Sequence, residues 1–283
     1  MSNQQITPAL RDWIVEQARA GHRPEAVLEA MKSSGWREDI ALEALETVLS
    51  GMVEEHAQGP GLSPPNRVPE LLLAGSSPRV WAHDREVSIL MSMREPRVVV
   101  FGNLLADEEC DEMVELADQR LARSHTVDTS TGDSEVNAAR TSDGMFFSRG
   151  EHLVCERLEA RLAALVQWPL ENGEGLQVLR YRPGAEYKPH YDYFDPVQPG
   201  TPSILKRGGQ RVATIVTYLN TPTRGGATTF PDVGLEIAPL KGHAVFFSYD
   251  RPHPTTRTLH GGAPVLEGEK WVATKWLRVG RFD

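Results

Sequence analysis

Cysteine is scarce in this sequence, which has only Cys110 and Cys155 among 283 residues. Small secreted domains are often held together by several disulfide bonds, and two cysteines cannot supply such a framework. Each cysteine lies in a segment with the apolar spacing of a helix. We therefore expect two buried thiols that pack as small hydrophobic groups, in a protein of a reducing compartment.

Long apolar runs and an excess of basic residues are also missing. No run approaches the roughly 20 residues that span a bilayer, and the N-terminus lacks the apolar core of a signal peptide. The formal net charge of -9 argues against a nucleic-acid groove, which is usually basic. Hydrophobic residues make up 40% of the chain, enough for a globular core. The expected protein is soluble and cytoplasmic, with neither a nucleic acid nor a membrane as partner.

Residues 1–51 are predicted to form a separate module of three short helices. Thr7 and Pro8 supply an N-cap and a first-turn proline, a second helix follows Pro24, and a third begins near Asp39. Apolar residues recur at helical spacing in all three segments: Leu10, Trp13, Ile14 and Ala18, then Val27, Ala30 and Met31, then Leu42, Leu45, Val48 and Leu49. Residues 52–70 are rich in proline and glycine and are predicted to be a linker.

Residues 71–283 remain for a larger domain, whose first part includes alternating stretches that could add strands. Helical periodicity appears at 106–121 and 151–165. Short runs typical of strands follow at 177–182, 187–193, 212–219, 227–230, 244–248 and 270–279. Many short strands after helices indicate an α+β domain. The polar segments 124–140 and 195–209 are predicted to be loops that move over a site, with plain surface loops as the alternative.

A candidate metal site begins with His190 and Asp192. Residues two apart on a strand point to the same face, so both side chains can converge on one ion. A His-x-Asp pair alone is more often a hydrogen-bonded strand pair, so a third ligand from elsewhere is needed. With His260, the set has two imidazoles and one carboxylate, which leave open positions on Fe(II) for a chelating cosubstrate and dioxygen. Other histidines that could serve are His125, His152, His243 and His253.

The predicted strand that begins at Lys270 has two distinct faces. Alternation places Lys270, Val272, Thr274, Trp276 and Arg278 on one of them. This face combines polar, cationic and aromatic groups, which suits a ligand pocket better than a plain core. Lysine is a compact point charge that can hold one end of a dicarboxylate.

Five ordered stretches resemble the 2-oxoglutarate and Fe(II) dependent dioxygenases, and among these the prolyl 4-hydroxylase (alpha-subunit-like) family. They read FGNLLADEECDEMVELA, RTSDGMFF, LRYRPGAEYKPHYDYFDP, GGQRVATIVTYLNTPTRGGATTFPDVG and LHGGAPVLEGEKWVATKWLR. The resemblance implies a distorted double-stranded β-helix, or jelly roll, with packing helices. Residues 1–51 are in turn similar to a ubiquitin-associated (UBA) three-helix domain, most clearly at Ser34, Gly35 and Trp36. Such a fold does not by itself imply ubiquitin binding.

The resemblance implies that His190, Asp192 and His260 bind iron and that Lys270 pairs with the distal carboxylate of 2-oxoglutarate. It favours His260 over His253, because the HGGAPV phrase and the step to Lys270 both attach to His260. The oxo-acid end of 2-oxoglutarate can chelate the metal while its other carboxylate meets the lysine.

Five further roles are implied by the same resemblance. Tyr181 and Thr214 belong to the cosubstrate pocket, Tyr181 and Trp276 are catalytic groups, and Arg211 and Arg278 are cations at the substrate end. From residue types alone, Tyr181, Thr214 and Trp276 could also be core residues whose polar groups are hydrogen-bonded. The two arginines could equally be solvated or salt-bridged groups.

The expected enzyme therefore uses Fe(II), 2-oxoglutarate and dioxygen, with ascorbate as reductant. It hydroxylates an unactivated C–H bond and releases succinate and CO2. The family favours a prolyl residue in a peptide or protein, and the helical module supports a protein substrate, since an attached domain can raise the local concentration of a partner. Three alternatives stay open: a hydroxylase of a free amino acid or other small molecule, a zinc hydrolase that would leave Lys270 without a role, and an inactive binding protein.

Overall fold

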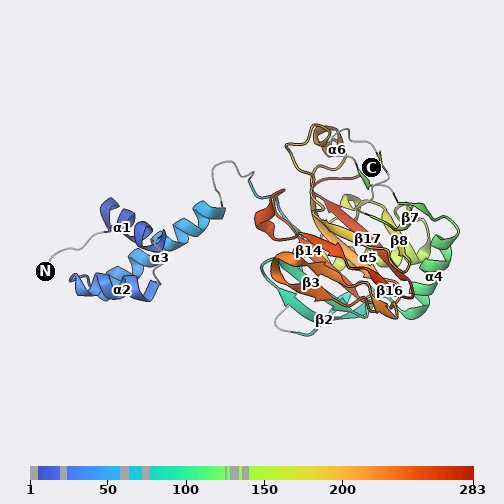
Figure 1. Cartoon of the computed structure of the whole chain (residues 1–283), viewed down its shortest axis with the longest axis horizontal. Coiled ribbons are helices and arrows are strands. Elements are labelled where there is room, and N and C mark those ends of the chain that lie inside the picture. The colour runs from blue at the N-terminus through green and yellow to red at the C-terminus, as the bar shows by residue number, and fades with distance from the viewer. Residues whose placement is uncertain are drawn as a thin grey trace. The chain divides into compact units, whose positions relative to one another are not determined.

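The computed structural model describes residues 6–19, 24–57, 64–71, 77–124, 126–127, 134–135 and 140–283. The chain divides into two compact units, Met1–Pro64 and Pro65–Asp283 (Figure 1). None of the described helices combines the length and the apolar character that crossing a membrane requires. Each unit has its own core, and the two are taken in turn.

Three helices make up the described part of the first unit: α1 (Pro8–Arg19), α2 (Pro24–Ser33) and α3 (Glu38–Ala57). The Leu10 amide donates to Thr7 Oγ1 at 3.3 Å, the contact of an N-cap. Gly35 turns the chain between α2 and α3 with φ 89°, a conformation that favours glycine. The core is formed by Leu10, Ile14, Val27, Met31, Ala41, Ala44, Leu45 and Val48.

The third helix is longer than the sequence suggests. It runs through Ala57, so residues 52–57, expected in a linker, are helical. The segment MVEEHA contains good helix formers, and the cost of about 1 kcal/mol for Gly51 is small enough for the helix to continue through it. Residues 58–63, the middle of the expected linker, lie outside the described residues.

A nine-stranded antiparallel sheet forms the framework of the second unit. In spatial order its strands are β1 (Arg79–Ala82), β2 (Arg85–Met93), β3 (Arg97–Gly102), β14 (Ala244–Ser248), β10 (Arg211–Tyr218), β17 (Lys270–Arg278), β8 (Leu176–Tyr181), β7 (Asp143–Phe147) and β4 (Ala122–Arg123). The strand β17 lies between β10 and β8, and every one of its residues is buried.

A smaller sheet has the order β13 (Leu235–Ile237), β12 (Thr228–Phe230), β15 (His260–Gly262) and β9 (Tyr187–His190). Two further pairs are β11 (Arg224–Gly225) with β16 (Val265–Glu267) and β5 (Thr126–Val127) with β6 (Ser134–Glu135). In the small sheet, β9 and β15 are antiparallel and place His190 directly opposite His260. Two histidines far apart in the sequence therefore become neighbours.

The two faces of the large sheet are covered by different layers. Helices α4 (Asp107–Asp118) and α5 (Leu153–Val166) pack on one face, where Phe246 joins Met113 and Leu158 in one core. The next residue, Phe247, points to the other face and packs with Phe230 of the small sheet. Short helices complete the unit: η2 (Leu170–Asn172), α6 (Thr201–Leu205), η3 (Pro231–Val233) and η4 (Pro254–Thr256).

The mixed helix-and-strand class with a sheet-rich core agrees with the sequence prediction. The expected helices and strands occur within a few residues of their predicted bounds, except that the strand expected over 187–193 ends at His190. The alternating stretches before the family motifs form β1 and β2. Cys110 and Cys155 are buried free thiols, as predicted.

Candidate active site

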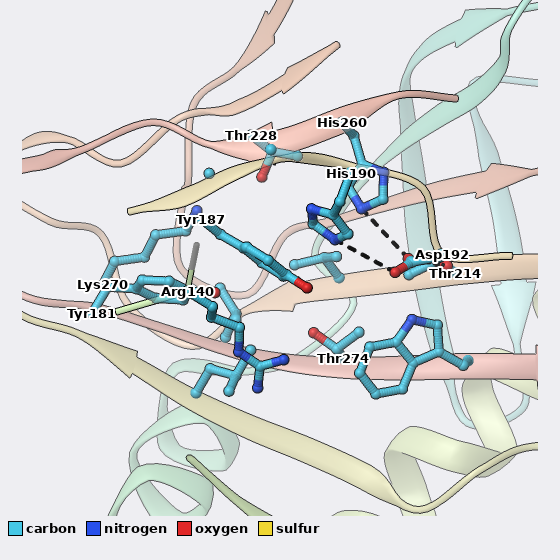
Figure 2. Close-up of a pocket in the computed structure, with 16 residues that line it drawn as sticks. Arg140, Tyr181, Tyr187, His190, Asp192, Thr214, Thr228, His260, Lys270 and Thr274 are labelled. Atoms are coloured by element: carbon cyan, nitrogen blue, oxygen red, sulfur yellow. Dashed lines mark hydrogen bonds and ion pairs between the residues drawn. The ribbon is translucent and has the colours of Figure 1, made fainter. Parts of the chain in front are cut away.

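Three side chains that could bind one metal ion meet between the two sheets. His190 Nε2 lies 3.5 Å from Asp192 Oδ1, and His260 Nε2 lies 3.4 Å from Asp192 Oδ2 (Figure 2). The candidate ligand atoms all lie within 4.8 Å of one another. Among the residues that the structure describes, this is the only group of three His, Cys, Asp or Glu side chains close enough to share an ion.

Asp192 reaches this place by a route that the sequence did not predict. The strand β9 ends at His190, and Asp192 lies in a bend beyond it. The convergence of the two side chains is therefore a property of the strand end and not of the two-residue alternation along a strand. The bend buries the Asp192 carboxylate, whose side chain is 5% exposed.

Backbone carbonyls fix the proton positions of both imidazoles. His190 Nδ1 lies 2.9 Å from the Lys188 carbonyl oxygen, and His260 Nδ1 lies 2.9 Å from that of Thr258. A carbonyl oxygen only accepts, so each Nδ1 carries the hydrogen, an assignment that rests on the hydrogen-bond geometry. In the neutral ring, Nε2 then keeps a free lone pair that faces the carboxylate. This is the arrangement in which metal-binding histidines are usually held.

The charges of the three groups also suit a divalent cation. Burial alone would raise the pKa of Asp192, but the neighbouring His260, His190 and Arg211 hold it well below its usual range, so the carboxylate is ionised. Burial lowers the pKa of His260 to about 4, so its ring is neutral at pH 7. Two imidazole nitrogens and one carboxylate oxygen form the donor set typical of non-haem Fe(II), and the residues present fit that ion.

Lys270 is a buried cation at the other end of the pocket. Its residue is 4% exposed, and burial lowers its pKa to about 8. In the described part of the chain no carboxylate pairs with it, and its Nζ lies 5.6 Å and 5.8 Å from the ring centroids of Tyr181 and Tyr218. Gly226 leaves space beside it, since a Cβ at that position would lie 3.2 Å from Lys270 Cδ. A buried ammonium without a partner favours an anionic ligand.

A pocket joins the metal-binding group to Lys270 (Figure 2). Its wall from β17 consists of Lys270, Val272, Thr274 and Trp276, so the predicted alternation is confirmed for these four residues. The other lining residues are Arg140, Leu179, Tyr181, Tyr187, His190, Asp192, Thr214, Val216, Thr228, His260, Gly261 and Gly262.

The three uncharged residues expected at the site all line this pocket. Tyr181 is the register partner of Lys270 across β8 and β17. Trp276 is buried, and its indole Nε1 has no hydrogen-bond partner among the described residues. Thr214 is turned toward the metal-binding group, because its hydroxyl lies 2.7 Å from Asp192 Oδ2.

Arg211 and Arg278 are not among the residues that line this pocket, and their expected role as cations at the substrate end stays a prediction. Both pair with the buried Glu174: Arg211 Nε and Nη2 lie 2.6 Å and 2.9 Å from its two oxygens, and Arg278 Nε lies 2.7 Å from Oε1. Burial would raise the pKa of Glu174, but the two guanidiniums lower it. These contacts are those of the salt-bridged alternative for the two arginines, because a buried carboxylate needs cationic partners to stay ionised.

Sequence reasoning missed Arg140, Tyr187 and Thr228. The Tyr187 ring stacks on His190 with centroids 3.7 Å apart, and the Arg140 guanidinium lies 5.3 Å from the Tyr187 ring centroid. Thr228 Oγ1 accepts a hydrogen bond from Tyr218 at 2.8 Å. Arg140 borders the expected mobile loop 124–140, most of which lies outside the described residues. No local pattern identifies these residues, because each reaches the pocket through tertiary contacts.

Similarity to known proteins agrees with this geometry. Residues 176–278 match the 2OG-Fe(II) oxygenase superfamily. Prolyl 4-hydroxylase 2 of Arabidopsis thaliana is 40% identical over 213 residues, which are 67% of this chain and 69% of that protein. The probable prolyl 4-hydroxylase 4 of the same plant is 39% identical over 232 residues, or 74% of this chain and 75% of that one.

A solved structure of similar fold is the viral collagen prolyl hydroxylase of Paramecium Bursaria Chlorella virus-1 in a 2OG complex. It is 30% identical, with a TM-score of 0.50, and the match covers 64% of this chain and 95% of the viral chain.

Proposed function

Because this chain belongs to the prolyl 4-hydroxylase family of 2OG-Fe(II) oxygenases, we propose that it hydroxylates prolyl residues of a peptide or protein and releases succinate and CO2. The observation that carries the proposal is the pairing of two sites in one pocket. The His190, Asp192 and His260 group could hold a metal ion and lines the pocket, and Lys270 is a buried cation that has no carboxylate partner among the described residues.

The two ends of 2-oxoglutarate match these two sites. Its oxo-acid end is a chelator for a metal held by the two histidines and Asp192, and its distal carboxylate suits Lys270. Bound Fe(II) would supply the redox chemistry, in which dioxygen oxidatively decarboxylates 2-oxoglutarate and its second oxygen atom enters a substrate C–H bond. Ascorbate is proposed as the reductant that keeps the iron in the Fe(II) state.

The protein's own residues position and shield the reactants. His260 stays neutral at pH 7 and so keeps a lone pair for the metal. Tyr181 and Thr228 present hydroxyl groups along the pocket, and Val272 and Trp276 give it an apolar wall. Such a wall excludes water, which strengthens the electrostatic contacts inside the pocket.

The finer assignments belong to the same proposal. We infer that the large and small sheets are the two faces of a distorted double-stranded β-helix, since the pocket lies between them. The three-helix unit is proposed to be UBA-like and to bind a protein partner, which favours a protein substrate over a free amino acid. The buried free thiols of Cys110 and Cys155 support a reducing compartment such as the cytoplasm.

Succinate formation from 2-oxoglutarate tests the proposal. The protein is incubated with Fe(II), ascorbate, 2-oxoglutarate and a proline-rich peptide, and the Asp192→Ala variant is assayed in parallel. Asp232→Ala is the matched control, because Asp232 is an exposed carboxylate outside the pocket. We expect peptide-dependent succinate and hydroxyproline from the wild type and the control, and neither from Asp192→Ala. Full activity of Asp192→Ala would refute the metal assignment.

A further inference from the structure

We propose that Thr214 and Tyr249 form a hydrogen-bonded relay that fixes the orientation of the Asp192 carboxylate and thereby sets the metal affinity of the site. The inference rests on the proposed Fe(II) function. It gives Thr214 a role different from the one expected from the sequence, which was contact with the cosubstrate. Both residues act through Asp192 and are positioning residues.

The geometry of the relay is tight and fully buried. Thr214 Oγ1 lies 2.7 Å from Asp192 Oδ2 and 3.0 Å from the Tyr249 hydroxyl oxygen. Thr214 is 0% and Tyr249 2% exposed, so water does not compete for these groups. Thr214 lies on β10, and Tyr249 directly follows β14, the strand paired with β10. Figure 2 places Thr214 beside Asp192, on the side of the site away from Lys270.

The number of protons fixes the direction of both hydrogen bonds. An ionised carboxylate only accepts, so the Thr214 hydroxyl must donate its single proton to Asp192. The Tyr249 hydroxyl must therefore donate to Thr214. Burial raises the pKa of Tyr249 well above its usual range, so it keeps the proton that this direction requires. A chain of this kind strengthens each bond through polarisation by the next.

The relay holds one oxygen of Asp192 while both oxygens face the histidines. Oδ2 accepts a hydrogen bond from Thr214 and lies 3.4 Å from His260 Nε2, and Oδ1 lies 3.5 Å from His190 Nε2. The Arg211 guanidinium holds the backbone of the same residue, with Nη1 3.4 Å from the Asp192 carbonyl oxygen. With the backbone and Oδ2 both restrained, the carboxylate cannot rotate freely about its side-chain bonds. Removing the Thr214 hydroxyl would leave Oδ2 buried without its donor and free the carboxylate to turn away from the histidines.

Cobalt binding tests the relay independently of turnover. Co(II) is titrated into the metal-free protein and followed by visible absorption, which reports both affinity and ligand geometry. The variants are Thr214→Val, which keeps the shape and removes the hydroxyl, Thr214→Ser, which restores it, and Tyr249→Phe, which removes only the first donor. We expect Thr214→Val to weaken Co(II) binding about 10–100-fold, as outer hydrogen-bond partners of metal ligands typically do. Thr214→Ser should recover most of that loss, and Tyr249→Phe should show a smaller one.

Thr217→Val is the matched control. Thr217 lies on the same strand, is 0% exposed, and its Oγ1 has no hydrogen-bond partner among the described residues. This variant should bind Co(II) with the affinity and absorption spectrum of the wild type. Thermal unfolding of each metal-free variant identifies any general loss of structure, and Tyr249→Phe and Thr214→Ser keep the test valid if Thr214→Val does not fold.

Two results would overturn the relay. One is wild-type affinity and spectrum in Thr214→Val, and the other is an equal loss in Thr217→Val, which would indicate a general packing effect. A wild-type protein that binds no Co(II) at all would instead overturn the proposed metal function on which the relay rests. The failure of the inference and that of the function are therefore distinguishable.

Discussion

His190 and His260 are direct register partners in the small sheet, with ring centroids 4.4 Å apart. The backbone pairing of β9 with β15 thus brings together two of the three candidate metal ligands, His190 and His260. Each Nδ1 is tied to a carbonyl of its own strand region, at Lys188 and Thr258. The ring positions are therefore set by the sheet before any metal binds.

Replacing His260 with alanine should abolish metal-dependent turnover, because only two of the three ligands remain. His253→Ala is the control, since His253 lies close in sequence but belongs to η4 and caps it through Thr255. Losing a ligand should cost more than losing an outer partner, so we expect the rate of succinate formation to fall by at least about 100-fold in His260→Ala. Similar activity of the two variants would contradict the assignment of His260 as a ligand.

Lys270→Met should weaken cosubstrate binding specifically. The change keeps a long apolar side chain and removes the charge that faces the pocket. Truncating one partner of a buried charge pair costs about 2–5 kcal/mol, so the Kd for 2-oxoglutarate should rise by at least about 30-fold. Isothermal titration calorimetry with the metal-loaded protein measures this Kd. The control is Lys241→Met, which removes a surface cation paired with Asp111. Unchanged affinity in Lys270→Met would remove the lysine from the cosubstrate site.

The affinity for 2-oxoglutarate should also depend on pH. Burial lowers the pKa of Lys270 to about 8, and only the protonated amine attracts the distal carboxylate. Binding should therefore be constant below about pH 8 and weaken above it, until the pH reaches the higher pKa that the lysine acquires in the complex. The same titration between pH 6.5 and 9.5, a range of about three units around that value, checks this. A pH-independent Kd across this range would count against Lys270 as the anion partner.

Glu174→Gln should destabilise the larger unit. Glu174 pairs with Arg211 and Arg278, and its replacement leaves two buried guanidiniums without their carboxylate. Breaking a buried pair by removing one partner typically costs about 3–5 kcal/mol of unfolding free energy. Urea denaturation measures the loss, and Glu171→Gln, at a nearby position on the short helix η2, is the control. Equal stability of the two variants would show that the arginines find other partners.

The contribution of Glu174 to folding stability should also depend on pH, with a predictable sign. The folded-state pKa of Glu174 lies below that of the unfolded chain, so its contribution is fully present above the unfolded value of about 4.5. It is lost as the pH falls through the folded-state pKa. The wild type should therefore lose its advantage over Glu174→Gln in acid, and a difference that persisted there would contradict the ionic origin.

Local patterns predicted one wall of the pocket well. Alternation along β17 placed Lys270, Val272, Thr274 and Trp276 on one face, because a strand with a two-residue repeat leaves no other arrangement. The same rule failed for Asp192, since the strand ends at His190 and a bend carries the carboxylate inward. A bend depends on contacts with other elements, which sequence periodicity does not contain.

Ion pairs between residues far apart in the sequence could not be predicted from local patterns either. Arg211 and Arg278 carry no local sign that both are bound to Glu174, which lies on a third segment of the chain. Arg140 and Tyr187 likewise meet at the pocket through an isolated backbone bridge. The family resemblance pointed to the candidate metal and cosubstrate residues that the pocket brings together, whereas the contacts that hold those residues in place required the structure.

Isotope labelling of the products tests the central claim most directly. The protein, Fe(II), 2-oxoglutarate and a proline-rich peptide are incubated under isotopically heavy dioxygen in ordinary water, and both products are analysed by mass spectrometry. The account predicts one heavy oxygen atom in succinate and one in the hydroxyproline of the peptide. Succinate and hydroxyproline without the label, or label in succinate with an unmodified peptide, would contradict prolyl hydroxylation by this enzyme.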